Sequence, residues 1–398
     1  MNVVLEPSSL SGEINAIPSK SYAHRIAICN FLAGNEPSAK CGQFSSNDIL
    51  VTENCLKAMR LGKKVLDCGE SGSTLRFLMP LCASLGGDYT FICHGKLIDR
   101  PNDELFLAMQ AHGVTAEKTD KITLSGKLTS GEYVLRGDIS SQYISGLLMA
   151  LPMLDGDSQI TLTTPLSSAP YVDITVEVLN GFGVKIDRTE KGFYVKGNQK
   201  FFGEVLPEGD WSNSAFFLVA GAINGEITVK GLNQQSAQGD KYIMEILSRA
   251  GAKICVCEKG VTVKKSALKA FSFDAEDCPD LVPISAVLAS FAQGESVIRN
   301  IQRLKIKESD RVETTIKMLS AFNVKAHTDG ENLFVLGGEP VGAEVDSYND
   351  HRIVMSSAVL ALGAFGDKSI ITNANAVAKS YPTFFNDYNY LGGKANEI

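Results

Sequence analysis

Lysine, arginine and serine side chains recur where helices are predicted to begin. Helix N-termini present free N–H groups and a partial positive charge, so several of them together form a strong anion site. Capping alone explains Ser, Asp and Asn at these positions, but not the added Lys and Arg, which oppose the helix dipole. This predicts a site for a phosphorylated substrate. The clusters are Ser19-Lys20-Ser21 with Arg25, Ser71-Gly72-Ser73-Thr74 with Arg76, Ser140-Ser141-Gln142, Asp280, and Asn349-Asp350-His351-Arg352.

A further set of cations lies outside these clusters. The run from Lys305 to Arg311 alternates in charge and lies between a predicted strand and a predicted helix start. Such a run is either a solvated helix face, whose ion pairs contribute little, or a functional loop. Arginine binds carboxylate or phosphate through two parallel hydrogen bonds, and lysine binds them as a point charge. The candidates for binding anionic oxygens are Lys20, Arg100, Arg311, Arg352 and Lys379.

Several common catalytic motifs are missing from the sequence. There is no G-x-x-x-x-G-K-[ST] phosphate loop, and Gly181-Phe182-Gly183 follows a predicted helix where a dinucleotide fingerprint would follow a strand. Gly69-Glu70-Ser71-Gly72 lacks the spacing of a hydrolase nucleophile elbow. The histidines show no metal-ligand spacing, so we expect no metal. His351 either belongs to the site or orients its neighbours.

The composition is that of a globular protein. The chain has 398 residues, 44% hydrophobic and 21% charged, with a net charge of -7. An acidic balance argues against a nucleic-acid partner, which requires a basic excess on one face. The nine cysteines form no C-x-x-C pair, which favours a reducing compartment. Apolar runs are shorter than the roughly 20 residues that span a bilayer, so we expect a cytoplasmic protein.

One pattern repeats six times: a polar start, an apolar helix-length run, a glycine turn and a β-type run. The period of about 70 residues exceeds the roughly 20 to 50 of common solenoids, so each repeat is a small α/β fold. The first repeat is shorter than the other five. The starts are Ser19, Ser71, Ser141, Asn213, Asp280 and Asp350.

A second helix is predicted in each repeat. Aspartate caps the start of most of these helices, and Gly or Asn follows the end. The predicted helices are Asp48 to Gly62, Asp103 to Gly113, Asp173 to Gly183, Asp240 to Gly251, Asp310 to Asn323 and Pro382 to Gly392. Six such repeats divide most simply into three and three, with a boundary near the polar link from Leu206 to Asp210.

Four motifs in this order closely resemble the 5-enolpyruvylshikimate-3-phosphate synthase family. They are Pro18-Ser19-Lys20-Ser21 with Arg25, Ser140-Ser141-Gln142, Lys307-Glu308-Ser309-Asp310-Arg311 and Asn349-Asp350-His351-Arg352. The resemblance implies a two-domain inside-out α/β barrel, in which each domain consists of three βαβαββ units. We expect one domain to comprise residues 1–12 and 211–398 and the other residues 13–210, with the active site in the cleft between them.

The resemblance implies transfer of the enolpyruvyl group of phosphoenolpyruvate to the 5-hydroxyl of shikimate 3-phosphate, with release of phosphate. The reaction is an addition and elimination through a tetrahedral intermediate, needs no cofactor, and belongs to aromatic amino-acid biosynthesis. Asp280 is expected to act as the base and Glu308 as the acid at C3, with Lys20 as a further catalytic residue. We expect the protein to act as a monomer on these two small substrates.

The resemblance also assigns binding residues. Ser21 and Arg25 would bind the shikimate carboxylate, and Gln142 would lie between both ligands. The residues assigned to shikimate 3-phosphate are Lys20, Ser21, Arg25, Ser140, Ser141, Gln142, Ser168, Asp280, Arg303 and Lys307. Those assigned to phosphoenolpyruvate are Lys20, Gly72, Arg100, Gln142, Arg311, Arg352 and Lys379.

Some positions depart from the family pattern. Glu70 stands where many relatives have Asn, Ser73 replaces Thr, and Arg303 stands where some relatives have Asn. Two other functions remain open: a UDP-N-acetylglucosamine enolpyruvyl transferase, which shares the fold and the donor, and a non-catalytic binding protein on the same fold. The first has an N-terminal Lys-Asn pair, whereas here Lys20 is followed by Ser21.

Overall fold

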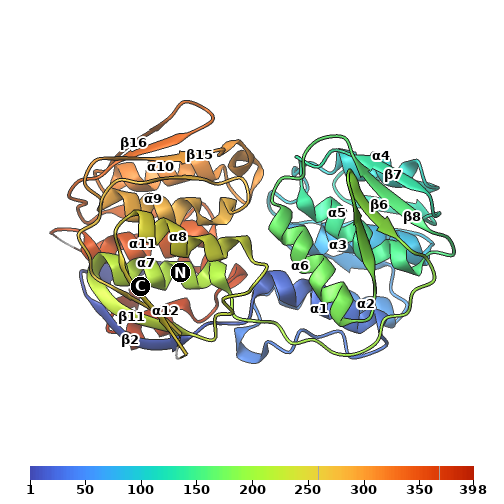
Figure 1. Ribbon diagram of the computed structural model, residues 1–398, viewed down its shortest axis with the longest axis horizontal. Helices are drawn as coiled ribbons and strands as arrows, with labels where there is room; N and C mark the ends of the chain where they lie inside the picture. The colour runs from blue at the N-terminus through green and yellow to red at the C-terminus, as the bar shows by residue number, and fades with distance from the viewer. Residues whose placement is uncertain (259, 367) are drawn as a thin grey trace. The chain divides into compact units, whose positions relative to one another are not determined.

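The computed structural model describes residues 1–258, 260–366 and 368–398. These residues form two compact units (Figure 1). Unit 1 comprises Met1–Ser19 and Glu208–Ile398, and unit 2 comprises Lys20–Pro207. The sequence predicts domain boundaries after residues 12 and 210, whereas the structure places them after residues 19 and 207.

Each of the six repeats contributes two α-helices, as the sequence predicts. Those of unit 2 are α1 (Lys20–Leu32), α2 (Asn47–Arg60), α3 (Gly72–Leu85), α4 (Asp103–Gln110), α5 (Ser141–Ala150) and α6 (Ala169–Gly181). Those of unit 1 are α7 (Trp211–Asn224), α8 (Ile243–Arg249), α9 (Val282–Ser290), α10 (Arg311–Ala321), α11 (His351–Gly363) and α12 (Phe384–Tyr390).

The strands of unit 2 form two four-stranded sheets. One has the order β3 (Val65–Asp67), β4 (Tyr89–Ile92), β6 (Ile122–Gly126), β5 (Val114–Lys118). The other has the order β7 (Glu132–Leu135), β8 (Ser158–Leu162), β10 (Gly192–Val195), β9 (Ile186–Thr189). In each sheet the first two strands are parallel and the other pairs are antiparallel.

Unit 1 contains three sheets with the same pattern. The first has the order β2 (Leu10–Asn15), β11 (Gly225–Lys230), β13 (Gly260–Lys264), β12 (Lys253–Cys257). The second has the order β14 (Ser272–Asp274), β15 (Glu295–Arg299), β17 (Leu333–Leu336), β16 (Lys325–Thr328). The third has the order β18 (Glu344–Asp346), β19 (Ser369–Thr372), β1 (Val3–Glu6), β20 (Lys394–Glu397). The N-terminal strands β1 and β2 complete two of these sheets, which is why residues before Lys20 belong to unit 1.

The first repeat differs from the other five. After α2 the chain enters β3 within a few residues, whereas the second helix of each later repeat is followed by a strand that joins its own repeat's sheet. Within the described residues, the first repeat therefore contributes two helices and no sheet of its own. The first repeat is shorter in the sequence because it lacks these strands.

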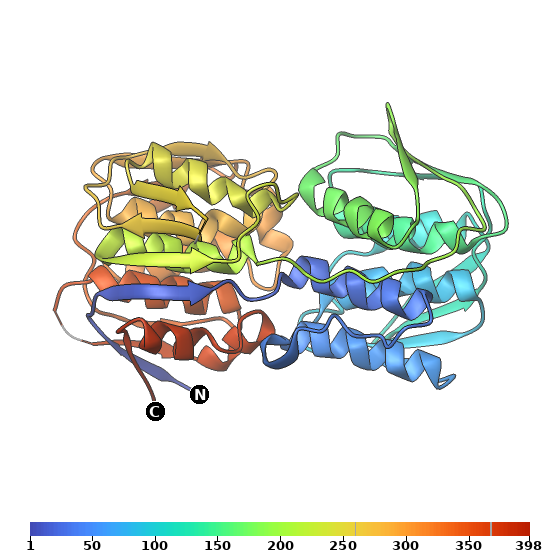
Figure 2. The ribbon, with the colours of Figure 1, turned by 60° about the horizontal axis from the view of Figure 1, so that its bottom comes forward.

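The first helix of each repeat in unit 1 lies in the core. All nine residues of α9 are buried, as are twelve of the thirteen in α11. A helix that is apolar on every side must be buried on every side, and α7, α9 and α11 pack against one another. Figure 2 shows the helices of each unit lying side by side. Their N-terminal residues are the polar ones that the sequence singles out.

Several predicted helix starts differ from those of the structure. The helix predicted from Asp240 begins at Ile243, after a 3-10 turn η3 (Gly239–Tyr242) that carries Asp240, and the one predicted from Asn213 begins at Trp211. The helix predicted from Asp173 begins at Ala169, because Pro170 in its first turn fixes a helical φ and lacks an N–H that would need a partner. Asp173 therefore lies inside α6, where it forms an ion pair with Arg188. The helix predicted from Asp280 begins at Val282, after a 3-10 turn η4 (Pro279–Leu281) that carries Asp280.

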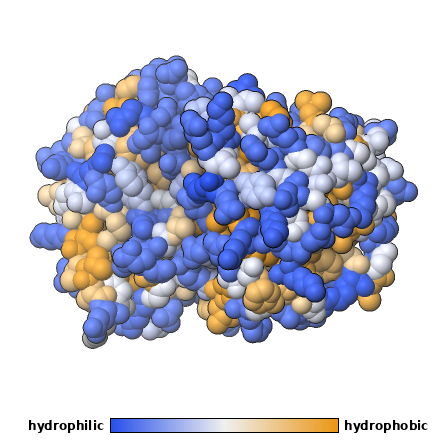
Figure 3. Space-filling model, turned by 45° about the vertical axis from the view of Figure 1, so that its right-hand side comes forward, coloured by the Kyte–Doolittle hydropathy of each residue, from blue (hydrophilic) through white to orange (hydrophobic). Residues whose placement is uncertain are grey.

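Figure 3 shows one face of the molecule coloured by hydropathy. On the face drawn in Figure 3, hydrophilic side chains dominate and apolar side chains form separate patches. No helix in the described part of the chain is both long and apolar enough to cross a membrane.

Candidate active site

Arg311 is the centre of a buried ion-pair network in unit 1. It is the first residue of α10, which begins there because Asp310 caps the N–H groups of Val312 and Glu313, both at 3.1 Å. Only 1% of Arg311 is exposed. Its partners are three carboxylates: Nε donates to Asp350 Oδ2 at 2.8 Å, Nη1 to Asp280 Oδ1 at 2.7 Å and Nη2 to Glu308 Oε2 at 2.6 Å.

Asp350 links this network to α11. It is fully buried and caps the helix by accepting from Arg352 N at 2.9 Å, while Oδ2 also accepts from Ser309 Oγ at 3.0 Å. The preceding residue, Asn349, has φ 57°, a left-handed conformation that Asn tolerates well. Its carbonyl accepts from Lys379 Nζ at 2.8 Å. Lys379, predicted for the same ligand as Arg352, therefore lies beside the start of α11.

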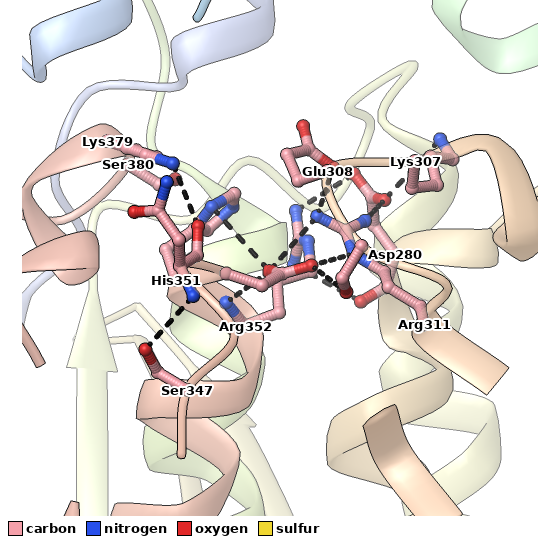
Figure 4. A network of polar contacts seen from close by, with 12 residues as sticks. Asp280, Lys307, Glu308, Arg311, Ser347, His351, Arg352, Lys379 and Ser380 are labelled. Atoms are coloured by element: carbon pink, nitrogen blue, oxygen red, sulfur yellow. Dashed lines mark hydrogen bonds and ion pairs between the residues drawn. The ribbon is translucent and has the colours of Figure 1, made fainter. Parts of the chain in front are cut away.

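Asp280 lies among three cations (Figure 4). Arg352 donates from Nη2 to Asp280 Oδ2 at 2.8 Å and from Nη1 to the Asp280 carbonyl at 3.1 Å. Arg311 Nη1 approaches Oδ1 from another direction, and Lys307 Nζ is 3.7 Å from the same oxygen. The Asp280 side chain is 18% exposed, so one ionised carboxylate meets three cations while still reachable by a small ligand.

These contacts determine the protonation states. Burial acts to raise the pKa of Asp280, but Arg352, Lys307 and Arg311 outweigh it and hold the pKa well below its usual range. Burial lowers the pKa of Lys307 to about 8, although Asp280 opposes the shift. Burial also disfavours the Arg311 cation, yet Asp350, Glu308 and Asp280 together raise its pKa. Asp280 is therefore ionised at neutral pH, and the Lys307 ammonium group loses its proton only slightly above neutral pH.

Arg303 lies near this group, in the 3-10 turn η5 (Gln302–Ile306). Its positive charge acts to lower the pKa of Lys307. The run from Lys305 to Arg311 lies between β15 and α10, and the interpretation as a solvated helix face is wrong for Lys307 and Arg311, which both pair with Asp280.

Unit 2 holds a second cationic group around Arg25. This side chain in α1 is 3% exposed, and burial lowers its pKa to about 10. Nε donates to Thr175 Oγ1 at 2.6 Å, Nη1 to the Ser21 carbonyl at 2.7 Å, and Nη2 to Ser145 Oγ at 3.2 Å and the Tyr171 carbonyl at 2.8 Å. A guanidinium has five N–H groups, so these bonds leave one, on Nη1, for a ligand.

Lys20 and Ser21 form the first turn of α1. Lys20 Nζ pairs with Asp48 Oδ2 at 3.1 Å, and its side chain is 18% exposed. The ion pair connects α1 to α2 and holds the ammonium at the helix N-terminus despite the unfavourable dipole. Lys20 is therefore a positioned cation that a ligand can still contact.

Arg76 orients Gln142 within unit 2. It lies four residues after Gly72 in α3, is 4% exposed, and donates from Nη1 to Gln142 Oε1 at 2.8 Å. Gln142 Nε2 donates in turn to Ser73 Oγ at 2.9 Å. Arg76 Nη2 also donates to the Pro101 carbonyl at 2.9 Å. One arginine thus fixes the amide of a predicted ligand residue and the backbone next to Arg100.

Gly72 allows Arg100 to approach the start of α3. A Cβ at this position would lie 2.6 Å from Arg100 Nη1 and 3.0 Å from Cζ, which is closer than side chains pack. The guanidinium therefore lies directly over the backbone of the helix N-terminus. Glu70, the unexpected acid, lies against Gly95 on the loop that leads to Arg100.

The three predicted phosphate-binding serines occupy helix starts. Ser140 caps α5 by accepting from Gln142 N at 3.3 Å, and Ser141 is its first residue. Ser168 is the N-cap residue of α6 and has φ 55°. All three are at least nine-tenths buried, at 8%, 6% and 2% exposure.

The structure thus assembles the predicted residues into groups within each unit. Asp280, Lys307, Glu308, Arg311 and Arg352 are in mutual contact in unit 1. The sequence places Arg76 and Asp350 in the polar clusters at helix starts but assigns no ligand to either, and it identifies the buried Asp240 only as a helix start. Arg76 had a usable signal, since it is a cation inside an apolar helix, whereas the contacts of Asp240 come from distant parts of the chain. No group of three or more His, Cys, Asp or Glu that could hold a metal occurs among the described residues.

The sequence matches a known protein family over most of its length. The family model described as EPSP synthase (3-phosphoshikimate 1-carboxyvinyltransferase) matches residues 61–388. The chain is 39% identical to the 3-phosphoshikimate 1-carboxyvinyltransferase of Clostridium acetobutylicum, over 100% of this chain and 99% of the relative. It is 38% identical to that of Clostridium novyi, over 100% and 98%.

Solved structures share the fold. EPSP synthase from Acinetobacter baumannii superposes with a TM-score of 0.79 at 21% identity, over the whole of both chains. The enolpyruvyl transferase NikO from Streptomyces tendae superposes with a TM-score of 0.78 at 17% identity, over 100% of this chain and 98% of the other. The predicted two-domain α/β fold is confirmed, and the chain belongs to the EPSP synthase (3-phosphoshikimate 1-carboxyvinyltransferase) family.

Proposed function

We propose that this protein transfers the enolpyruvyl group of phosphoenolpyruvate to the 5-hydroxyl of shikimate 3-phosphate and releases phosphate. The observation that carries the proposal is the cluster of Lys307, Arg311 and Arg352 around the ionised Asp280. Such a site binds an anion and holds a proton acceptor beside it. This combination suits the addition of a hydroxyl to a highly charged enol phosphate donor.

Phosphoenolpyruvate is the proposed ligand of Arg311 and Arg352, together with Lys379, Arg100, Gln142, Lys20 and the backbone at Gly72. In the free protein Arg311 is paired with Glu308 at 2.6 Å. An incoming carboxylate or phosphate competes for the same N–H groups. Displacing Glu308 removes the cation that keeps it ionised, so that it can take up a proton.

Shikimate 3-phosphate is the proposed ligand of the serine and arginine groups of unit 2. Arg25 with Ser21 would bind the carboxylate through the one N–H that its protein contacts leave. Ser140, Ser141 and Ser168 would bind the phosphate at the starts of α5 and α6. Gln142, Lys20, Asp280, Arg303 and Lys307 complete the proposed set.

The chemistry then follows from the charges. The 5-hydroxyl loses its proton to Asp280 as its oxygen bonds to C2 of phosphoenolpyruvate, and C3 receives a proton from Glu308. In the second half C3 returns a proton to Glu308, the bond from C2 to the phosphate oxygen breaks, and the leaving phosphate takes the proton held by Asp280. General acid and base groups each contribute about 10² to 10⁴ in rate. Lys20 is the other candidate for the proton at C3.

Phosphate release measures this function directly. Phosphoenolpyruvate is incubated with shikimate 3-phosphate, with UDP-N-acetylglucosamine, or with no acceptor. We expect phosphate only in the first reaction. Phosphate release with UDP-N-acetylglucosamine would favour the related transferase. No phosphate release in any of the three reactions would favour a binding protein.

We also propose a monomer in a reducing, cytoplasmic compartment. The sequence has no C-x-x-C pair, which supports a reducing compartment. Light scattering tests the monomer.

A further inference from the structure

Asp240 is a buried carboxyl with few hydrogen bonds. It lies in the 3-10 turn η3 (Gly239–Tyr242) and is 4% exposed. The hydroxyl of Ser212 is a hydrogen-bond partner, while Oδ1 has none within the part of the chain that the structure describes. Ionised carboxylates in protein interiors normally accept several hydrogen bonds, because desolvation is otherwise costly. The site therefore suits a neutral carboxyl better than an ionised one.

The charges around Asp240 also favour its neutral form. Asp280 on η4 and Asp210 at the start of α7 both repel its negative charge, while Arg352 on α11 attracts it. Arg352 already donates to Asp280 Oδ2 at 2.8 Å and to Ser212 Oγ at 2.7 Å. Burial, the largest effect, and Asp280 raise the pKa of Asp240 to about 7. The Cys278 thiol, also close by, has its pKa raised mainly by burial and so stays neutral.

We propose that Asp240 takes up one proton from solvent when an anion binds at Arg352, and that it returns this proton when the anion leaves. An anion on this guanidinium neutralises the one cation that favours ionised Asp240 and adds a further negative charge beside it. Both changes favour the protonated carboxyl. The identity of the anion as phosphoenolpyruvate rests on the proposed function. The coupling itself requires only that an anion binds Arg352.

Calorimetry in buffers of different ionisation enthalpy counts the protons bound. At about pH 8, one unit above the Asp240 pKa, most of the carboxyl is ionised before binding. We expect phosphoenolpyruvate, and separately sulfate, which has no titratable proton near neutral pH, to bind with uptake of close to one proton at Asp240. The Asp240→Asn variant should bind both anions with uptake smaller by close to one proton, since any proton taken up by Lys307, whose pKa is about 8, is common to both proteins. Equal uptake by the variant and the wild type would overturn the proposal.

The unliganded protein provides a second test. Because the folded pKa of Asp240 is raised, the wild type loses stability as pH rises from about 4 to about 7, and Asp240→Asn does not. The melting temperature of the variant should therefore rise relative to wild type across this window. A constant difference would mean that Asp240 is only structural, which would overturn the proposal. Asp350→Asn is the matched control, since Asp350 is also buried but is paired with Arg311, and it should lower the melting temperature.

The two tests separate the proposals. If phosphoenolpyruvate does not bind while sulfate binds with proton uptake, the proposed function fails and the coupling holds. If phosphoenolpyruvate is turned over but neither anion brings a proton, the function holds and the coupling fails.

Discussion

Removing the Arg311 cation should destabilise unit 1 strongly. In Arg311→Met the apolar stem remains, but Asp350 loses its two bonds to Arg311, at 2.8 and 3.4 Å, in a fully buried position. Taking one partner from a buried ion pair costs about 3 to 5 kcal/mol, because the other charge stays buried and unpaired. At about 2 to 4 °C per kcal/mol for units of 150 to 250 residues, the melting temperature should fall by roughly 6 to 20 °C.

The protein carries its own probe for this measurement. Trp211, the one tryptophan in the sequence, is fully buried at the start of α7 in unit 1. Its fluorescence therefore follows the unfolding of that unit. The matched control is Lys317→Met, which removes a cation from the same helix but from an exposed pair with Glu313. Exposed pairs contribute about 0 to 1 kcal/mol, so this control should change little.

A double-mutant cycle then tests the cause. Adding Asp350→Asn to Arg311→Met removes the unpaired charge, so we expect it to recover about 1 to 3 kcal/mol. If the single variant costs less than about 1 kcal/mol, or if the two losses simply add, the buried pair does not stabilise unit 1 and the reasoning fails.

Three further changes test other parts of the site. Gly72→Ala would place a Cβ 2.6 Å from Arg100 Nη1, so the KM for phosphoenolpyruvate should rise about tenfold or more, equivalent to about 1.4 kcal/mol. Gly338→Ala, with open space around it, is the control. An unchanged KM for Gly72→Ala would contradict the placement of Arg100. Arg76→Lys keeps the charge but cannot donate to Gln142 and Pro101 together. Because a hydrogen bond to a charged group contributes about 1.5 to 3 kcal/mol, kcat/KM should fall about 10- to 100-fold. Activity within twofold of wild type would exclude the positioning role. Lys307 loses its charge as pH rises through about 8, so the KM for shikimate 3-phosphate should rise above that pH, and Lys307→Arg should move this rise to higher pH.

Local signals predicted much of the molecule. Helix caps and glycine ends predicted two helices in every repeat, which is confirmed, but the prediction of a β-type run in every repeat is wrong for the first, which has no sheet of its own among the described residues. Lys307, Glu308 and Arg311 were predicted together because they are neighbours in the sequence. Asp173 misled the prediction, since a capping residue and an interior residue of a helix look alike when Pro170 can also begin the helix.

The remainder of the site depends on packing over long sequence distances. Arg311 and Asp350 lie on different helices, and only the packing of α10 against α11 brings them to 2.8 Å. Asp240 is a helix-starting aspartate by pattern, yet its chemistry comes from Arg352 and Asp280. No local spacing encodes such contacts. They depend instead on how the buried helices of the repeats pack within unit 1.

The most direct test of the proposed function is the product formed in deuterium oxide. With phosphoenolpyruvate and shikimate 3-phosphate present, we predict equal amounts of phosphate and of a new enolpyruvyl ether, with deuterium in its methylene group. Addition makes C3 a methyl group for a time, so that elimination can remove hydrogen in place of the added deuterium. Product without deuterium, or phosphate without the ether, would contradict the addition and elimination assigned to Asp280 and Glu308.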